Sequence, residues 1–205
     1  MKLFNYIKNN QWVKSIINLH LTTNESINLP YHNLYHTLVV SNSVLEACQF
    51  YNISKEETDA SVCAGLFHDF NHSGGKQTDT WNVNTAIEAY NKWNSQTNKF
   101  KDNLVESLIL STKYPYEKEQ SELTLLECIM RDADMSQLLQ TNRIQQNYLG
   151  VGKEFGLNAR QSIEGTIKFI QTVVPNTVWF KMKWDSEKPI IEEELNLLLD
   201  CYTNL

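Results

Sequence analysis

Residues 64–75 read Ala64-Gly65-Leu66-Phe67-His68-Asp69-Phe70-Asn71-His72-Ser73-Gly74-Gly75. An apolar segment that can be buried as a helix ends here in an imidazole, a carboxylate and a second imidazole, and two helix-breaking glycines follow. Four of the five histidines in the chain form two pairs with the same spacing, His32/His36 and His68/His72. This grouping predicts a metal site at the end of a buried helix.

The composition is that of an ordinary globular protein. A chain of 205 residues with 41% hydrophobic and 20% charged residues suits a single domain, residues 1–205, with one large core. The net charge of −6 argues against a broad nucleic-acid surface. No apolar run approaches the ~18 residues of a membrane span, and the N-terminus lacks the pattern of a secretion signal. We therefore expect a cytoplasmic protein without membrane or nucleic-acid partners, and its oligomeric state stays open.

The spacing of apolar residues predicts an all-α fold, a single compact helical bundle with the metal site in its core. Only seven glycines and four prolines punctuate the chain, and apolar residues between them recur three and four apart. Breaks are expected near Gly156, Pro175 and Pro189. The expected helices are one or two within 3–19, then 31–51, 55–69, 79–93, 100–112, 121–134, 135–155, 158–173, 176–184 and 189–203.

Candidate metal ligands end or begin several of these helices. His36 lies in the first turns of the helix at 31–51, and His68 and Asp69 end the next helix. Asp132 and Asp134 end a later helix and point to different sides of it, so only one of them is expected to be a ligand. Hydrolysis at a divalent ion needs such imidazole and carboxylate ligands, with one position left open for water.

This order of His, His-Asp and Asp on helices resembles the signature of the HD-domain metal-dependent phosphohydrolases. The flanking residues resemble one branch, the 3′,5′-cyclic-nucleotide phosphodiesterases. Residues 31–36, YHNLYH, are similar to the YHNxxH of that branch; residues 68–74, HDFNHSG, are similar to its HDxxHxG; residues 133–136, ADMS, are similar to its ADxS. These segments span about residues 31–136. The helices of residues 137–205 are expected to complete the substrate pocket of a single catalytic domain.

The resemblance implies a role for each matching residue. The ligands of a first divalent ion, Zn²⁺ or Fe²⁺ by their chemistry, would be His36, His68, Asp69 and Asp134. Asp69 would also bridge to a second ion, Mg²⁺ or Mn²⁺, with His72 near that ion or its waters. The water between the two ions would be the nucleophile. His32 would act as the general acid that protonates the leaving oxygen.

Three further positions are candidates for supporting the site. Tyr31 is a candidate substrate contact, although packing alone would also explain it. Asn33 is a candidate for holding the site residues in place without itself touching metal or substrate, and Glu88 is a candidate for orienting His32. For Asn33, as for His72, capping of a helix end is the alternative. For Glu88 the alternative is a solvated helix face.

The residues that select the purine base in the family are replaced in this chain. Ile163 stands where the family has a glutamine, and Thr166 stands where it has a stacking phenylalanine. Lys113 stands where the family has an acidic residue beside metal-bound water, and we expect Lys113 to contact an additional phosphate or another anion. The metal chemistry is therefore expected to be kept, and recognition of the base is expected to be either rebuilt or lost.

The resemblance implies a metal-dependent phosphodiester hydrolase that acts on a cyclic nucleotide. Two alternatives stay open at this point: an HD-type nucleotide phosphomonoesterase of the 5′-nucleotidase kind, and a metal-containing protein that binds a nucleotide without hydrolysing it. A di-iron oxygenase of the HD type is disfavoured, because such a site needs additional histidines and this chain has none to spare.

Overall fold

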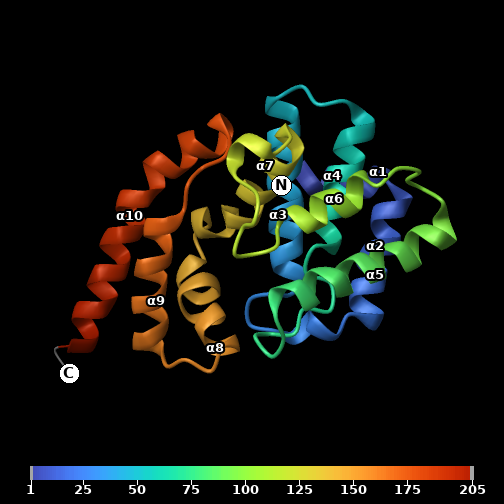
Figure 1. Ribbon diagram of the computed structural model, residues 1–205. Coiled ribbons are helices and arrows are strands. Elements are labelled where there is room, and N and C mark those ends of the chain that lie inside the picture. The colour runs from blue at the N-terminus through green and yellow to red at the C-terminus, as the bar shows by residue number, and fades with distance from the viewer. Residues whose placement is uncertain (1, 204–205) are drawn as a thin grey trace.

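The computed structural model describes residues 2–203, and within this range it contains helices and no strand, which confirms the all-α prediction (Figure 1). None of these helices is both long enough and apolar enough to cross a membrane. The elements in chain order are α1 (Lys2–Asn9), α2 (Gln11–Thr23), η1 (Glu25–Asn28), α3 (Leu34–Phe50), α4 (Lys55–Phe67), α5 (Asp79–Thr97), α6 (Leu104–Ser111), η2 (Gln120–Glu122), α7 (Leu125–Met135), η3 (Ser136–Leu139), η4 (Ile144–Val151), α8 (Gly152–Glu154), α9 (Ala159–Thr172) and α10 (Val178–Thr203).

The centre of the molecule is built by α3, α4, α6 and α7, which pack against one another. Val40, Leu66 and Ile129 from three of these helices have no exposed surface. At the crossing of α3 and α4, a Cβ on Gly65 would lie 3.0 Å from Ser41 Oγ, so the two helices approach closely because one residue has no side chain. This crossing brings the beginning of α3 beside the end of α4.

Short polar side chains determine where the central helices begin and end. Asn33 Oδ1 accepts hydrogen bonds from the backbone N–H groups of Tyr35 and His36, so α3 begins at Leu34 rather than at residue 31. The helix expected to reach Asp69 ends at Phe67, and Asn71 beyond it has a left-handed φ of 60°. His68 and Asp69 therefore lie in the turn that leaves α4.

The C-terminal third differs most from the expected helices. The single helix expected over residues 135–155 is divided into η3, η4 and α8. In contrast, α10 continues through Pro189, where a break was expected. Pro189 has no backbone N–H, so the carbonyl of Asp185, one turn earlier, lacks its helical hydrogen bond. Both residues are exposed to water, whereas Ile191 and Leu195 on the inner face are fully buried. Because the missing bond faces solvent, burial of the inner face keeps the helix continuous.

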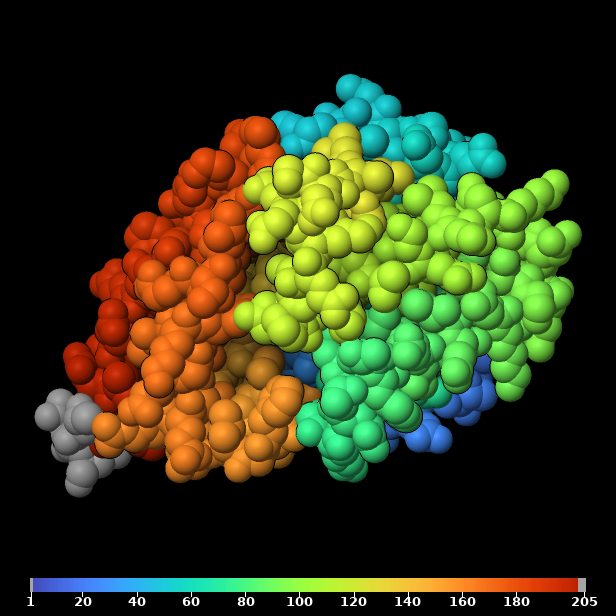
Figure 2. Space-filling view, viewed as in Figure 1, coloured from blue at the N-terminus to red at the C-terminus, as the bar shows by residue number. Residues whose placement is uncertain are grey.

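Helices α9 and α10 pack against each other beside the centre, and α8 and η4 lie between them and α3 (Figure 1). Figure 2 shows a hollow between this layer and the segments that follow α4 and α6. The hollow opens toward the beginning of α3 and the turn after α4. The fold thus places a cavity beside the histidines that the sequence singles out.

Asp132 anchors α10 to the centre. Its carboxylate, which is 1% exposed, accepts hydrogen bonds from Asn176 N at 2.8 Å, Asn176 Nδ2 at 2.9 Å and Thr177 N at 2.7 Å. Asp132 therefore faces away from Asp134, as expected for two residues two apart on a helix, and it serves the structure instead of the histidine cluster.

We expect Asp132→Ala to destabilise the fold by about 2–4 kcal/mol, because it leaves buried backbone N–H groups at the beginning of α10 without an acceptor. Urea unfolding followed by circular dichroism measures the change. Asp185→Ala, at an exposed position on α10, is the matched control and should cost no more than about 0.5 kcal/mol. Equal stability of the two variants would contradict the anchoring role.

Candidate metal centre and adjoining cavity

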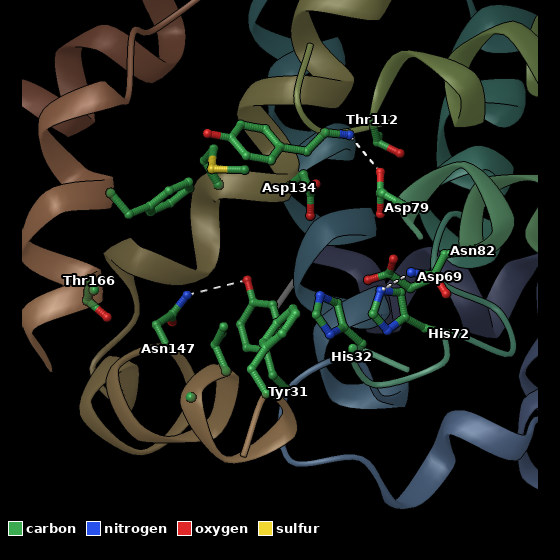
Figure 3. A pocket seen from close by; sticks show the side chains of 18 of the residues that line it. Tyr31, His32, Asp69, His72, Asp79, Asn82, Thr112, Asp134, Asn147 and Thr166 are labelled. Atoms are coloured by element: carbon green, nitrogen blue, oxygen red, sulfur yellow. Dashed lines mark hydrogen bonds between the residues drawn. The ribbon is translucent and has the colours of Figure 1, made fainter. Parts of the chain in front are cut away.

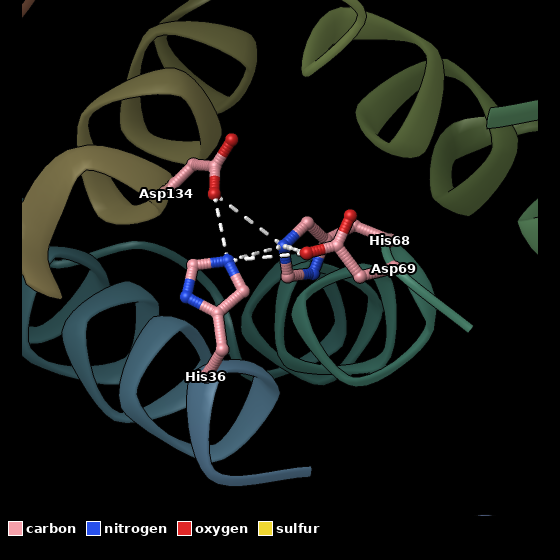
Figure 4. Close-up of side chains that lie close together, drawn as sticks. All are labelled: His36, His68, Asp69 and Asp134. Atoms are coloured by element: carbon pink, nitrogen blue, oxygen red, sulfur yellow. Dashed lines mark hydrogen bonds and ion pairs between the residues drawn. The ribbon is translucent and has the colours of Figure 1, made fainter. Parts of the chain in front are cut away.

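Four side chains from three elements converge in the centre of the molecule (Figure 4). His36 comes from α3, His68 and Asp69 from the turn that follows α4, and Asp134 from α7. One ligand atom of each lies within 4.8 Å of those of the other three. The structure therefore brings together the residues expected to bind the first ion, and it selects Asp134 over Asp132.

Hydrogen bonds on the outer side of the cluster determine which ring nitrogens face inward. His68 Nδ1 lies 2.9 Å from the carbonyl of Gly65, which can only accept, so Nδ1 carries the proton. His36 Nδ1 lies 2.6 Å from Gln137 Oε1, and Gln137 Nε2 donates to Gln146, which fits Oε1 as the acceptor. Each neutral imidazole then points the lone pair of Nε2 into the cluster.

With both imidazoles neutral, the atoms that face the centre of the cluster are all hydrogen-bond acceptors, and none of them carries a proton to donate. The two Nε2 atoms of His36 and His68 are 3.2 Å apart. Asp69 Oδ2 lies 3.2 Å from Nε2 of each histidine, and Asp134 Oδ1 lies 3.0 Å from His36 Nε2. Asp69 Oδ2 is buried and has no hydrogen-bond partner. Two imidazole nitrogens and two carboxylate oxygens form a set of metal-ligating atoms that fits Zn²⁺, Fe²⁺ or Mn²⁺.

Without a cation the cluster attracts protons. Burial opposes the charged form of His36, but the carboxylates of Asp134 and Asp69 beside its ring outweigh burial and raise its pKa to about 9. The pKa of His68 is likewise raised, mainly by the charge of Asp69. The pKa of Asp69 and that of Asp134 are lowered by the two histidines despite their burial. The site therefore requires positive charge, from protons or from a metal ion.

A cavity of about 500 Å³ adjoins the cluster (Figure 3). Asp69 and Asp134 are part of its wall, as are Tyr31, His32 and His72. The remaining wall comes mainly from α5, η4, α8 and α9, and much of it is apolar. A volume of this size suits a ligand of about nucleotide dimensions.

His32 is held on the cavity wall by a carboxylate that the sequence did not indicate. His32 Nδ1 lies 2.5 Å from Glu154 Oε2, and Glu154 Oε1 accepts the backbone N–H groups of Tyr31 and His32 at 2.5 and 2.9 Å. Burial raises the pKa of Glu154, but the bond from His32 outweighs it and keeps the carboxyl ionised. Glu88 is exposed on α5, so the expectation that Glu88 orients His32 is replaced by Glu154.

His72 stacks on His32, with ring centroids 3.6 Å apart. Its Nδ1 accepts the backbone N–H of Gly74 at 3.1 Å, and its Nε2 lies 2.9 Å from Asn82 Nδ2. Burial lowers the pKa of His72 to about 4, so the ring is neutral near pH 7. His32, His72 and Glu154 form a second compact group of potential ligands. In this group the Glu154 carboxylate already accepts from the His32 ring and from two backbone N–H groups.

The structure does not bring every candidate substrate contact to the cavity. Thr166 lies on the wall, whereas Ile163 is 1% exposed and belongs to the hydrophobic core. Lys113 Nζ pairs with Glu117 at 2.6 Å and is not part of the wall. The acidic residue on that side is Asp79, which accepts the Tyr114 N–H at 2.6 Å. Burial raises the pKa of Asp79, and the charges of Asp69 and Asp134 add to the shift.

The sequence missed the residues whose role depends on distant partners. Gln137 lies three residues after Asp134 in the same turn, a spacing that could have marked it as a neighbour of the site. Glu154 reaches His32 across 122 positions of the chain, and no local pattern signals this contact. Asn147 on the cavity wall gave no local signal either.

Comparisons with known proteins add no identification. No protein-family model matches this chain, and a search of curated proteins finds no match. The geometry of the cluster and its cavity is therefore the basis for assigning a function.

We expect Mn²⁺ or Zn²⁺ to raise the melting temperature of the metal-stripped protein, because an ion that binds only the folded state stabilises it by mass action, about 2.7 kcal/mol at one hundred times the dissociation constant. Asp69→Asn should weaken binding at least tenfold in isothermal titration calorimetry. Asp185→Asn, at an exposed carboxylate, is the control and should bind like the wild type. Full metal binding by Asp69→Asn would contradict this assignment.

A second expectation concerns the pH dependence of the metal-stripped protein. The pKa of His36 is about 9 when folded and about 6.5 when unfolded, so its contribution to stability is present below pH 6.5 and is lost as the pH rises through 9. His20 and His72, with pKa values near 4, are largely neutral in both states above pH 7.5. Melting temperatures should therefore fall from pH 7.5 to 9.5. Saturating metal should reduce that fall without abolishing it, because burial also raises the pKa of the Cys48 and Cys63 thiols, which ionise in this range only in the unfolded chain. A metal-stripped protein whose melting temperature rises over this range would contradict the expectation.

Proposed function

We propose that the protein is a metal-dependent phosphohydrolase of the HD-domain kind that cleaves a phosphodiester in a small nucleotide. The observation that carries the proposal is the donor-free cluster of His36, His68, Asp69 and Asp134 beside a cavity whose wall also holds His32. When bound, a divalent ion supplies polarisation of the phosphoryl group and activation of water. The chain's own residues position the substrate and supply the proton.

His32 is the proposed general acid. Glu154 binds Nδ1 and therefore leaves Nε2 of the same ring available to the leaving oxygen of a substrate in the cavity. Stacking on His72 restrains the plane of the ring. A positioned acid of this kind contributes most when the leaving group is a poor one, such as the ribose oxygen of a phosphodiester. This supports a diesterase over a monoesterase.

A second ion beside the first is part of the proposal. Asp69 contributes Oδ2 to the cluster while its side chain also lines the cavity, which supports Asp69 as a residue that would help to hold both ions. His72 and Asp79 lie on the same wall and would hold water around a second ion, Mg²⁺ or Mn²⁺. In this proposal Asp79 on α5 takes the place of the acidic residue beside metal-bound water, which the family has at the position of Lys113.

The proposal is tested by assaying the Mn²⁺- and Mg²⁺-loaded protein on cyclic mononucleotides, cyclic dinucleotides, nucleoside monophosphates and an activated aryl phosphodiester. We expect His32→Gln to lower turnover of a cyclic nucleotide by about 10²–10⁴-fold, because the poor leaving group needs the proton. The aryl ester, whose leaving group needs no acid, should lose less than about tenfold.

Glu88→Gln on the exposed face of α5 is the matched control for this experiment and should leave both activities unchanged. Equal losses on the two esters would show that His32 has a structural role. Hydrolysis of monophosphates alone would replace the diesterase by a monoesterase. Tight nucleotide binding without turnover of any substrate would refute the hydrolase.

A further inference from the structure

Asn147 has a buried oxygen that nothing in the protein satisfies. The residue is 7% exposed and lies on the cavity wall, and its Oδ1 has no hydrogen-bond partner. Its Nδ2 donates to Tyr31 Oη at 3.3 Å. A buried acceptor without a donor is unfavourable, so its presence on the wall of a cavity indicates that a ligand supplies the missing N–H or O–H group.

The position of Asn147 is determined by the packing of η4. This element is a π-helix, a conformation that is rare and is often associated with functional sites. A Cβ on Gly150 would lie 3.1 Å from the carbonyl oxygen of Pro30, so η4 lies directly against the segment that carries Tyr31. A Cβ on Gly152 would overlap Ser162 on α9. The amide of Asn147 is therefore presented by a closely packed element.

Tyr31 connects Asn147 to the metal centre. Its ring lies against that of His36, with centroids 4.6 Å apart, while its hydroxyl reaches Asn147. Figure 3 shows Tyr31 between Asn147 and His32, with His72 on the side away from Asn147. A ligand with its phosphate at the cluster would pass along the Tyr31 ring and present its other end to Asn147.

The chemistry of the wall restricts that other end. Among the described residues that line the cavity there is no lysine or arginine, so negative charge can be compensated only at the metal end. The wall also includes the apolar side chains of Leu138, Val151 and Phe155, which suit a flat, uncharged ring. Thr166, also on this wall, already donates its hydroxyl to the Ser162 carbonyl.

We propose that Asn147 is a specificity-determining residue that accepts a hydrogen bond from the amino group of a planar base, such as that of adenine. An amide carries an acceptor beside a donor, and the second N–H of Nδ2 can pair with an unprotonated ring nitrogen next to the amino group. This deepens the proposed function, on which it rests for the position of the phosphate. Base recognition then comes from η4 instead of from positions 163 and 166.

The test compares adenosine with purine riboside, which lacks only the amino group, by isothermal titration calorimetry on the full-length, metal-stripped protein. Neither compound contains a phosphate, so the measurement is independent of hydrolysis. We expect adenosine to bind about 10- to 100-fold more tightly than purine riboside, because the latter leaves Oδ1 unpaired. N6,N6-dimethyladenosine, which has no N–H donor, should also lose this advantage.

Asn147→Leu should bring the affinities for adenosine and purine riboside to within about twofold of each other. Asn91→Leu, at an exposed position on α5, is the matched control and should keep the preference. Equal affinities of the wild type for adenosine and purine riboside, or no adenosine binding at millimolar concentration, would overturn the inference. This result comes from the wild-type protein alone and does not depend on whether a variant folds. Selective binding of adenosine together with no turnover of any phosphodiester would refute the proposed function and leave this inference standing.

Discussion

Two imidazole nitrogens and two carboxylate oxygens face one another at the junction of α3, α4 and α7 without a donor among them. The groups behind them make this arrangement possible: the Gly65 carbonyl and Gln137 each take the outer proton of a histidine ring. The two histidine rings are buried and only the two carboxylates face the cavity, so water relieves the repulsion only in part. The centre of the fold is thus built around a positive charge that protons or a metal ion must supply.

The layer formed by η4, α8, α9 and α10 contributes residues to the site as well as covering it. Glu154 accepts the backbone N–H groups of Tyr31 and His32 as well as the His32 ring, so one buried carboxylate connects α8 to the segment that precedes α3. Asp132 holds the beginning of α10 from the other side. These long-range contacts join two parts of the chain into one cavity with a charged end and a largely apolar end.

Prediction from the sequence succeeded where a local pattern is sufficient. The all-α class follows from apolar spacing, and His36, His68, Asp69 and Asp134 do converge as their order along the chain suggested. It failed where solvent or distant packing decides the outcome. Pro189 does not interrupt α10 because its missing hydrogen bond faces water, and Ile163 turns into the core instead of toward a substrate.

The histidine and aspartate pattern by itself indicated a set of candidate metal ligands, because the residue types and their order at helix ends can be read directly from the sequence. The tertiary structure decided which carboxylate faces the cluster, which one holds His32 and which amide oxygen stands unpaired on the cavity wall. Asp134, Glu154 and Asn147 have these roles because α7, α8 and η4 are oriented by contacts with residues far away in the chain. The contacts of Glu154 and Asn147 form only on folding, so no local pattern around these two residues could have indicated them.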